Sequence, residues 1–140
     1  MKISLLKHPL HPPWVHFPMA LLPFSFVASV WEYCGGSPEL GIVAHHTLQL
    51  GLLAALVALA TGFVDYLGVD GEGAAERSVQ RHLWVMSTGV TAFFAAWLLP
   101  KTGSESRLVP LACEAVGTLG LVVGGWLGGH SVYVHGVGRR

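Results

Sequence analysis

The sequence has few charged side chains. Of its 140 residues only 11% are Asp, Glu, Lys or Arg, and eight acids balance eight bases, so the formal net charge is zero. Soluble domains carry roughly 25% charged residues. A chain with 52% hydrophobic residues and a mean hydropathy of +0.56 is instead typical of a membrane protein. Because the bases occur singly or in pairs, nucleic-acid binding is not expected.

Motifs of the common hydrolases are also missing. The chain contains no HExxH or CxxC motif and no arrangement of Ser, His and Asp that indicates a nucleophile. The glycine-rich segment 71–73 is too short and too acidic to hold a phosphate. A hydrolase is therefore not expected.

Long hydrophobic stretches dominate what is present. About 20 apolar residues of helix cross a hydrocarbon core about 30 Å thick, and four stretches supply that length: 14–33, 42–67, 82–99 and 108–133. Turn-forming residues separate them, and no alternating pattern indicates strands. We predict an all-α fold with one transmembrane domain over residues 1–140. Its short loops favour an integral membrane four-helix bundle with up-down-up-down connectivity.

The positions of Lys and Arg predict the orientation. The N-terminus, the second connection and the C-terminus share one side and hold six bases, whereas the opposite side holds Lys101 and Arg107. By the positive-inside rule both termini are cytoplasmic. The first stretch is too long for a signal peptide and lacks a small-residue cleavage site, so we expect it to be retained as a membrane helix.

Histidine is as abundant as Lys and Arg combined, with eight residues. On the predicted topology six of them converge on the cytoplasmic side from separate segments: His8, His11, His16, His82, His130 and His135. An interfacial histidine can also face water or lipid headgroups. His16 and His82 form the sharpest pair, since each lies near the cytoplasmic end of its helix and the two helices can be diagonal in a bundle. His8 and His11 precede prolines, which favours extended backbone for both.

The fourth stretch carries a stripe of small residues. Gly117, Gly124 and Gly128 point to nearly the same side as His135. Such stripes let helices approach closely, within one chain or in a homodimer. A similar stripe on 42–67 makes close packing of the second and fourth helices one explanation. A flat macrocycle lying against Gly124 and Gly128 is the functional alternative.

Three ligands suit a histidine cluster in a membrane bundle. Haem b would take two axial ligands from among His16, His82 and His135, with Arg77 and Arg81 near its propionates. Copper would favour the pairs of His and Met at helical spacing, namely His16 with Met19 and His82 with Met86. Zinc would draw on three or four of a larger set: His8, His11, His16, His82 and Asp65.

Several other ionisable side chains lie close to predicted helix ends. Asp65 opposes the helix dipole at the end of 42–67, so we expect a neighbouring base, either Arg81 or the free ring nitrogen of a ligating histidine. Glu114 lies inside the fourth stretch, where a carboxylate is costly. His45 and His46 lie at comparable depth in the second stretch, and with Glu114 they define a candidate outer site that could neutralise charge, relay protons or bind a quinol.

The chain has two cysteines, Cys34 and Cys113. Both are expected on the outer side, at the end of the first helix and the start of the fourth. An oxidising compartment would permit a disulfide between them.

The motif residues resemble a known family. The opening HPLHPPWVHFP at 8–18, GFVDY at 62–66, His82, and GGWLGG at 124–129 followed by Tyr133 and His135 are similar to the bacterial four-span family called domain of unknown function 2231. The resemblance covers nearly the whole chain and implies a bacterial inner-membrane protein. Some members carry a Rieske-type iron-sulfur domain, which implies membrane electron transfer. The residues that match the family pattern are His8, His11, His16, Asp65, His82 and Tyr133, whereas His45, His46 and His130 lie outside it.

The sequence therefore predicts a small b-type cytochrome that exchanges electrons with a quinone or a redox protein. Two alternatives remain open at this point. One is a membrane protein that binds copper or zinc, and the other is a non-catalytic subunit of a membrane complex. Whether the chain is an enzyme component is left open by the sequence.

Overall fold

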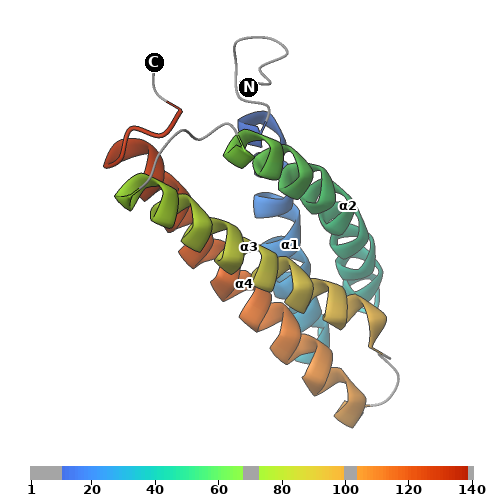
Figure 1. The fold of residues 1–140 in the computed structure, drawn as a ribbon. Helices are drawn as coiled ribbons and strands as arrows, with labels where there is room; N and C mark the ends of the chain where they lie inside the picture. The colour runs from blue at the N-terminus through green and yellow to red at the C-terminus, as the bar shows by residue number, and fades with distance from the viewer. Residues whose placement is uncertain (1–10, 68–72, 100–103, 139–140) are drawn as a thin grey trace.

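The computed structural model describes residues 11–67, 73–99 and 104–138. Over these residues the chain forms four helices and no strand: α1 (His11–Tyr33), α2 (Glu39–Leu67), α3 (Ala74–Leu98) and α4 (Ser104–Tyr133) (Figure 1). The predicted all-α four-helix bundle is confirmed.

The helices form two antiparallel hairpins. α1 packs mainly on α2 and α3 mainly on α4, and the two hairpins touch less extensively through α2 with α3 and α1 with α4. α1 and α3 are therefore diagonal. The starts of α1 and α3 lie at the same end of the bundle as the ends of α2 and α4 (Figure 1). We call this the His11 end, and the opposite end the Arg107 end.

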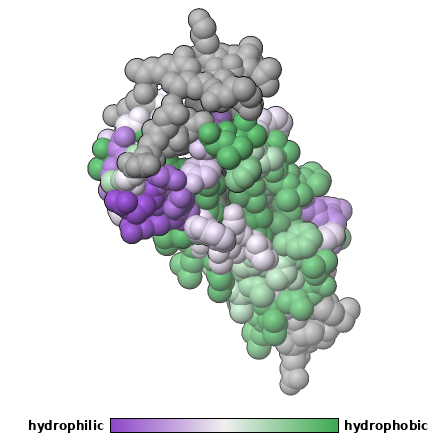
Figure 2. Space-filling view, in the orientation of Figure 1, coloured by the Kyte–Doolittle hydropathy of each residue, from purple (hydrophilic) through white to green (hydrophobic). Residues whose placement is uncertain are grey.

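Three helices are long and apolar enough to cross a membrane: α1, α2 and residues 107–133 of α4. α3 does not reach that level of hydropathy along its described length, although residues 82–99 were expected as a span. Large hydrophobic side chains cover the outer surface, including Trp84, Leu53 and Leu119, each more than 60% exposed. Figure 2 shows this hydrophobic surface along the helices. Such extensive apolar exposure suits a lipid environment.

Each helix begins earlier than predicted. The structure starts the four helices at His11, Glu39, Ala74 and Ser104 instead of residues 14, 42, 82 and 108. Hydropathy identifies the apolar part of a helix, whereas helix formers such as Ala, Glu, Gln and Arg extend α3 by two turns before His82. His82 therefore lies within α3 and does not open it.

His11 is helical, so its expected extended backbone is wrong. Pro12 and Pro13 follow it in the first turn of α1. Proline is tolerated there because N–H groups of the first turn have no partner within the helix.

The glycine stripe of α4 packs against α3. A Cβ atom at Gly117 would lie 2.5 Å from the Phe93 ring, and one at Gly124 would collide with Met86 Sδ. On α2, the Cβ position of Gly51 is 2.7 Å from Leu22 of α1. The small-residue stripe of α2 thus packs on α1, and that of α4 packs on α3. The predicted packing of the two stripes against each other is wrong.

Gly120→Ala is predicted to destabilise the second hairpin. The new Cβ would lie 2.9 Å from the Gly89 Cα, so a backbone would have to move. We expect a loss of about 1–3 kcal/mol in the free energy of unfolding, measured by circular dichroism in detergent. Gly129→Ala is the matched control, since its Cβ would meet nothing closer than Tyr133 at 3.9 Å. Equal stability of the two variants would contradict the close packing of α3 on α4.

Candidate site between paired histidines

His11 is fixed to α2 by two hydrogen bonds. Its backbone N–H donates to Asp65 Oδ2 at 3.1 Å, and its ring Nδ1 donates to the Ala58 carbonyl at 2.8 Å. The ring also lies against Gly62, where a Cβ atom would be 3.0 Å from Nδ1. The start of α1 is therefore tied to the end of α2, with the imidazole in a defined orientation.

His82 is held in the same way by α4. Its ring Nδ1 donates to the Gly124 carbonyl at 2.7 Å. A Cβ atom at Gly128 would lie 2.9 Å from His82 Cε1 and 3.1 Å from Nδ1. As with His11, the ring occupies the space that a side chain on the neighbouring helix would otherwise fill.

The two hairpins share one register. Gly62 follows Ala58 by four residues, as Gly128 follows Gly124. Each carbonyl accepts an imidazole Nδ1–H, and each glycine four residues later contacts the same ring. The first hairpin and the second hairpin therefore present equivalent histidines.

The equivalence extends along the helices. Leu22 follows His11 by 11 residues, as Phe93 follows His82, and both are fully buried. Leu22 packs on Gly51, and Phe93 packs on Gly117. Gly51 precedes Gly62 by 11 residues, and Gly117 precedes Gly128 by the same number. The bundle is an approximate internal repeat of one helical hairpin.

The equivalent imidazoles meet. The ring centroids of His11 and His82 are 6.3 Å apart, and their planes are inclined by 75°. A neutral imidazole that donates its Nδ1–H keeps its lone pair on Nε2, so both rings are in the tautomer that ligates through Nε2. Nε2 of each ring is thus the atom that would hold a metal ion or a haem iron.

The histidine that the structure brings to His82 is thus not His16. His16 is exposed on α1. It lies five positions after His11, so the two side chains point in different directions on the helix. His135 instead lies beside His130, with ring centroids 5.2 Å apart, and His130 stacks on Trp126. These last residues form an aromatic group at the end of α4, together with the exposed Tyr133.

The carboxylate of Asp65, at the C-terminal end of α2, is paired neither with Arg81 nor with a histidine ring of the described residues. Its carboxylate accepts the backbone N–H of His11 rather than a ring N–H. The negative end of α2 thereby meets the positive end of α1, which is favourable for both helix dipoles.

The other described residues that were predicted to bind a metal or haem do not form a cluster with His11 and His82. His8 lies outside the described residues, and within the described ranges no three His, Cys, Asp or Glu side chains form a group that could hold a metal ion. The expected zinc set is therefore not assembled among these residues. Arg77 and Arg81 are both exposed on the first turns of α3, at the His11 end.

Glycines expected to face a macrocycle have another neighbour. Gly124 is covered by Met86, and Gly128 by the His82 ring. The stripe is therefore a packing surface for α3, because small residues allow the helices to approach closely. The same stripe is not free to dimerise through this face.

At the Arg107 end, His45 and His46 are exposed neighbours with ring centroids 5.6 Å apart, and Glu114 is buried. Cys34 and Cys113 are free thiols, so the disulfide that the sequence permits is absent. Cys34 lies beyond the end of α1 and is exposed, whereas Cys113 is partly buried on α4.

Sequence reasoning missed the carbonyls of Ala58 and Gly124, which orient the two rings. A backbone acceptor leaves no mark in composition. The available signal was the glycine four residues after each acceptor, within the motifs at 62–66 and 124–129.

An apolar four-helix bundle with two equivalent hairpins and a pair of oriented histidines defines an integral membrane protein with a paired-histidine site. The chain belongs to the family described as "Predicted membrane protein (DUF2231)", whose model matches residues 7–140. No curated protein and no solved structure matches the chain.

Asp65→Ala is predicted to weaken the contact between α1 and α2. The variant removes a charged acceptor from the first N–H of α1, which costs about 0.5–2 kcal/mol. Asp65→Asn keeps an acceptor oxygen and should retain part of this stability. Denaturant unfolding in detergent measures the difference, and identical midpoints for Asp65→Ala and the parent protein would show that the contact contributes nothing.

Proposed function

We propose that this membrane protein binds haem b through His11 and His82 and acts in electron transfer. The observation that carries the proposal is the meeting of two imidazoles whose Nδ1 atoms each donate to a carbonyl, leaving two Nε2 lone pairs. Bis-histidine ligation of haem needs this tautomer in both residues. When bound, haem would supply one-electron chemistry.

The surroundings of the pair support the same reading. The two rings come from diagonal helices in different hairpins, and the hairpins pack less extensively on each other than each does internally. A flat ligand between the imidazoles would lie between the two hairpins and would leave the packing within each hairpin intact. Arg77 and Arg81 lie one turn apart on α3, before His82, and offer positive charge for propionates at this end.

Orientation and partners form part of the proposal. The bases favour a His11 end that faces the cytoplasm of a bacterial inner membrane. A quinone or a redox protein would be the partner in electron transfer.

Copper is a second candidate ligand, for one specific reason. Met86 and His82 occupy one face of α3. Met86 packs on Gly124, and the His82 ring bonds to the Gly124 carbonyl. Met19 reaches the adjacent Gly125, with its Cε 3.1 Å from the Cβ position. Thioether and imidazole ligands together favour Cu(I).

Replacement of single histidines tests the site. We expect His11→Ala and His82→Ala each to abolish the low-spin haem spectrum of protein purified in detergent, whereas exposed His16→Ala keeps it. The measurement is the absorption spectrum of air-oxidised and dithionite-reduced protein, expressed with ample haem. A spectrum that survives the double variant, or no haem in the parent protein, would refute the proposal.

Elemental analysis of the same preparations separates the two candidates. Copper that is retained by the parent protein and lost in Met86→Leu, without haem absorption, would favour the copper site. Haem content unaffected by Met86→Leu would favour the cytochrome.

A further inference from the structure

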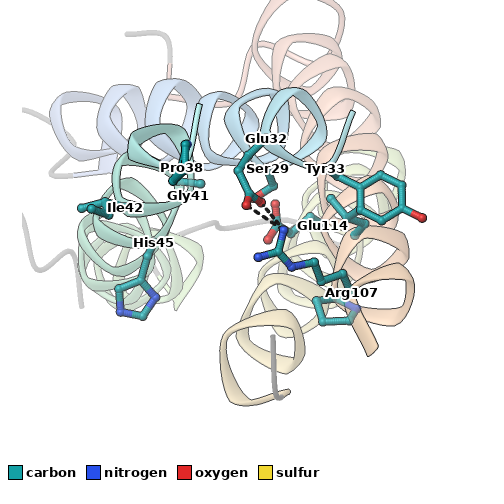
Figure 3. Close-up of a pocket in the computed structure, with 12 residues that line it drawn as sticks. Ser29, Glu32, Tyr33, Pro38, Gly41, Ile42, His45, Arg107 and Glu114 are labelled. Carbon is teal, nitrogen blue, oxygen red and sulfur yellow. Dashed lines mark hydrogen bonds and ion pairs between the residues drawn. The ribbon is translucent and has the colours of Figure 1, made fainter. Parts of the chain in front are cut away.

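The Arg107 end contains a second polar site. A cavity of about 380 Å³ opens there among residues of α1, α2 and α4 (Figure 3). Its polar lining includes Glu32, His45, Arg107 and Glu114, while residues such as Ile42 and Leu111 supply apolar walls. Pockets of about 300–1,000 Å³ with apolar walls and a few polar groups are typical of small-molecule sites.

Charge restricts what the cavity can accept. Arg107 Nη1 lies 2.6 Å and 2.7 Å from the two carboxylate oxygens of Glu32. Figure 3 shows the carboxylate of Glu114 pointing to the same guanidinium. Two carboxyl groups, those of Glu32 and Glu114, line the cavity beside the single guanidinium of Arg107. A phosphate or carboxylate ligand would add a further acid to this lining and is disfavoured. A group that donates hydrogen bonds suits this lining.

In the internal repeat, Glu114 corresponds to an apolar residue of the first hairpin. Glu114 precedes Gly124 by ten residues, as Leu48 precedes Ala58, so the two occupy equivalent positions. Leu48 is fully buried in the core, and Glu114 is only 1% exposed. The first hairpin thus has a buried leucine where the second has a buried carboxyl group, and a carboxyl group at membrane depth is costly enough to indicate a functional site.

We propose that this cavity binds the head group of a lipid-soluble quinol. One quinol hydroxyl would donate to Glu114 on α4, the other would donate to the imidazole of His45 on α2, and the ring would lie against Ile42 and Leu111. The choice of a quinol among hydrogen-bond donors rests on the proposed redox function. The existence of the cavity and its preference for a hydrogen-bond donor do not depend on that function. A lipid-soluble ligand can enter from the bilayer because α1, α2 and α4 are the apolar helices of the bundle.

The cavity and the paired histidines can be tested separately. Ser29 lines the cavity and lies 18 residues after His11 on the same helix, a separation of about 27 Å at 1.5 Å per residue. Substitutions at one end should leave the other end intact.

Photolabelling in lipid nanodiscs tests the proposal. The probe is an azido derivative of decylubiquinol, kept reduced under anaerobic conditions, with unlabelled decylubiquinol as competitor. We expect displaceable label in peptides that cover 29–45 and 107–114. Glu114→Leu, which copies the equivalent Leu48, and His45→Ala should each weaken competition at least tenfold. His46→Ala is the matched control and should leave it unchanged, because His46 is adjacent but does not line the cavity.

Several results would overturn the proposal. These are competition that persists in Glu114→Leu, an equal loss in His46→Ala and His45→Ala, or stronger competition by dodecylammonium than by the quinol, which would indicate a cationic ligand. Circular dichroism verifies that each variant is folded. Displaceable label in a protein without a haem spectrum overturns the proposed function and supports the cavity. A haem spectrum without displaceable label overturns the cavity alone.

Discussion

Each hairpin depends on an imidazole that reaches a backbone carbonyl of the neighbouring helix. Within a helix, a carbonyl already accepts the N–H four residues later, but its second lone pair can accept another donor. A side chain at that later position would cover the approach. Gly62 and Gly128 remove this obstacle, so His11 and His82 bond to Ala58 and Gly124. Close helix packing, the ring tautomer and the ring position all follow from the same pair of glycines.

Much of the fold could be predicted from the sequence, because the length of an apolar stretch is a local property. Four helices, their order and their antiparallel arrangement followed from it, and His82 was recognised as a candidate. The helix that covers the Gly117 to Gly128 stripe could not be predicted, since a small-residue face does not specify its partner. His16 was preferred to His11 because helix starts were placed by hydropathy, which ignores the tolerance of proline in a first turn.

The repeat is preserved at one end of the bundle and broken at the other. At the His11 end the two hairpins present the same residue in the same hydrogen-bonding arrangement. At the Arg107 end, Leu48 of one hairpin corresponds to Glu114 of the other. An approximate two-fold arrangement suits a ligand held equally from both sides, whereas a carboxyl group that has no counterpart in the other hairpin suits a ligand with distinct ends.

The uneven packing of the bundle has a consequence for its assembly. Contacts within each hairpin join segments that are adjacent in the chain, and such contacts form quickly because little chain entropy is lost in closing them. We therefore expect the two hairpins to insert and close as separate units before they dock. On this expectation His11 and His82, which belong to different hairpins, come together in the docking step. A ligand held by both residues would act at that step as the link that joins two preformed halves into one molecule.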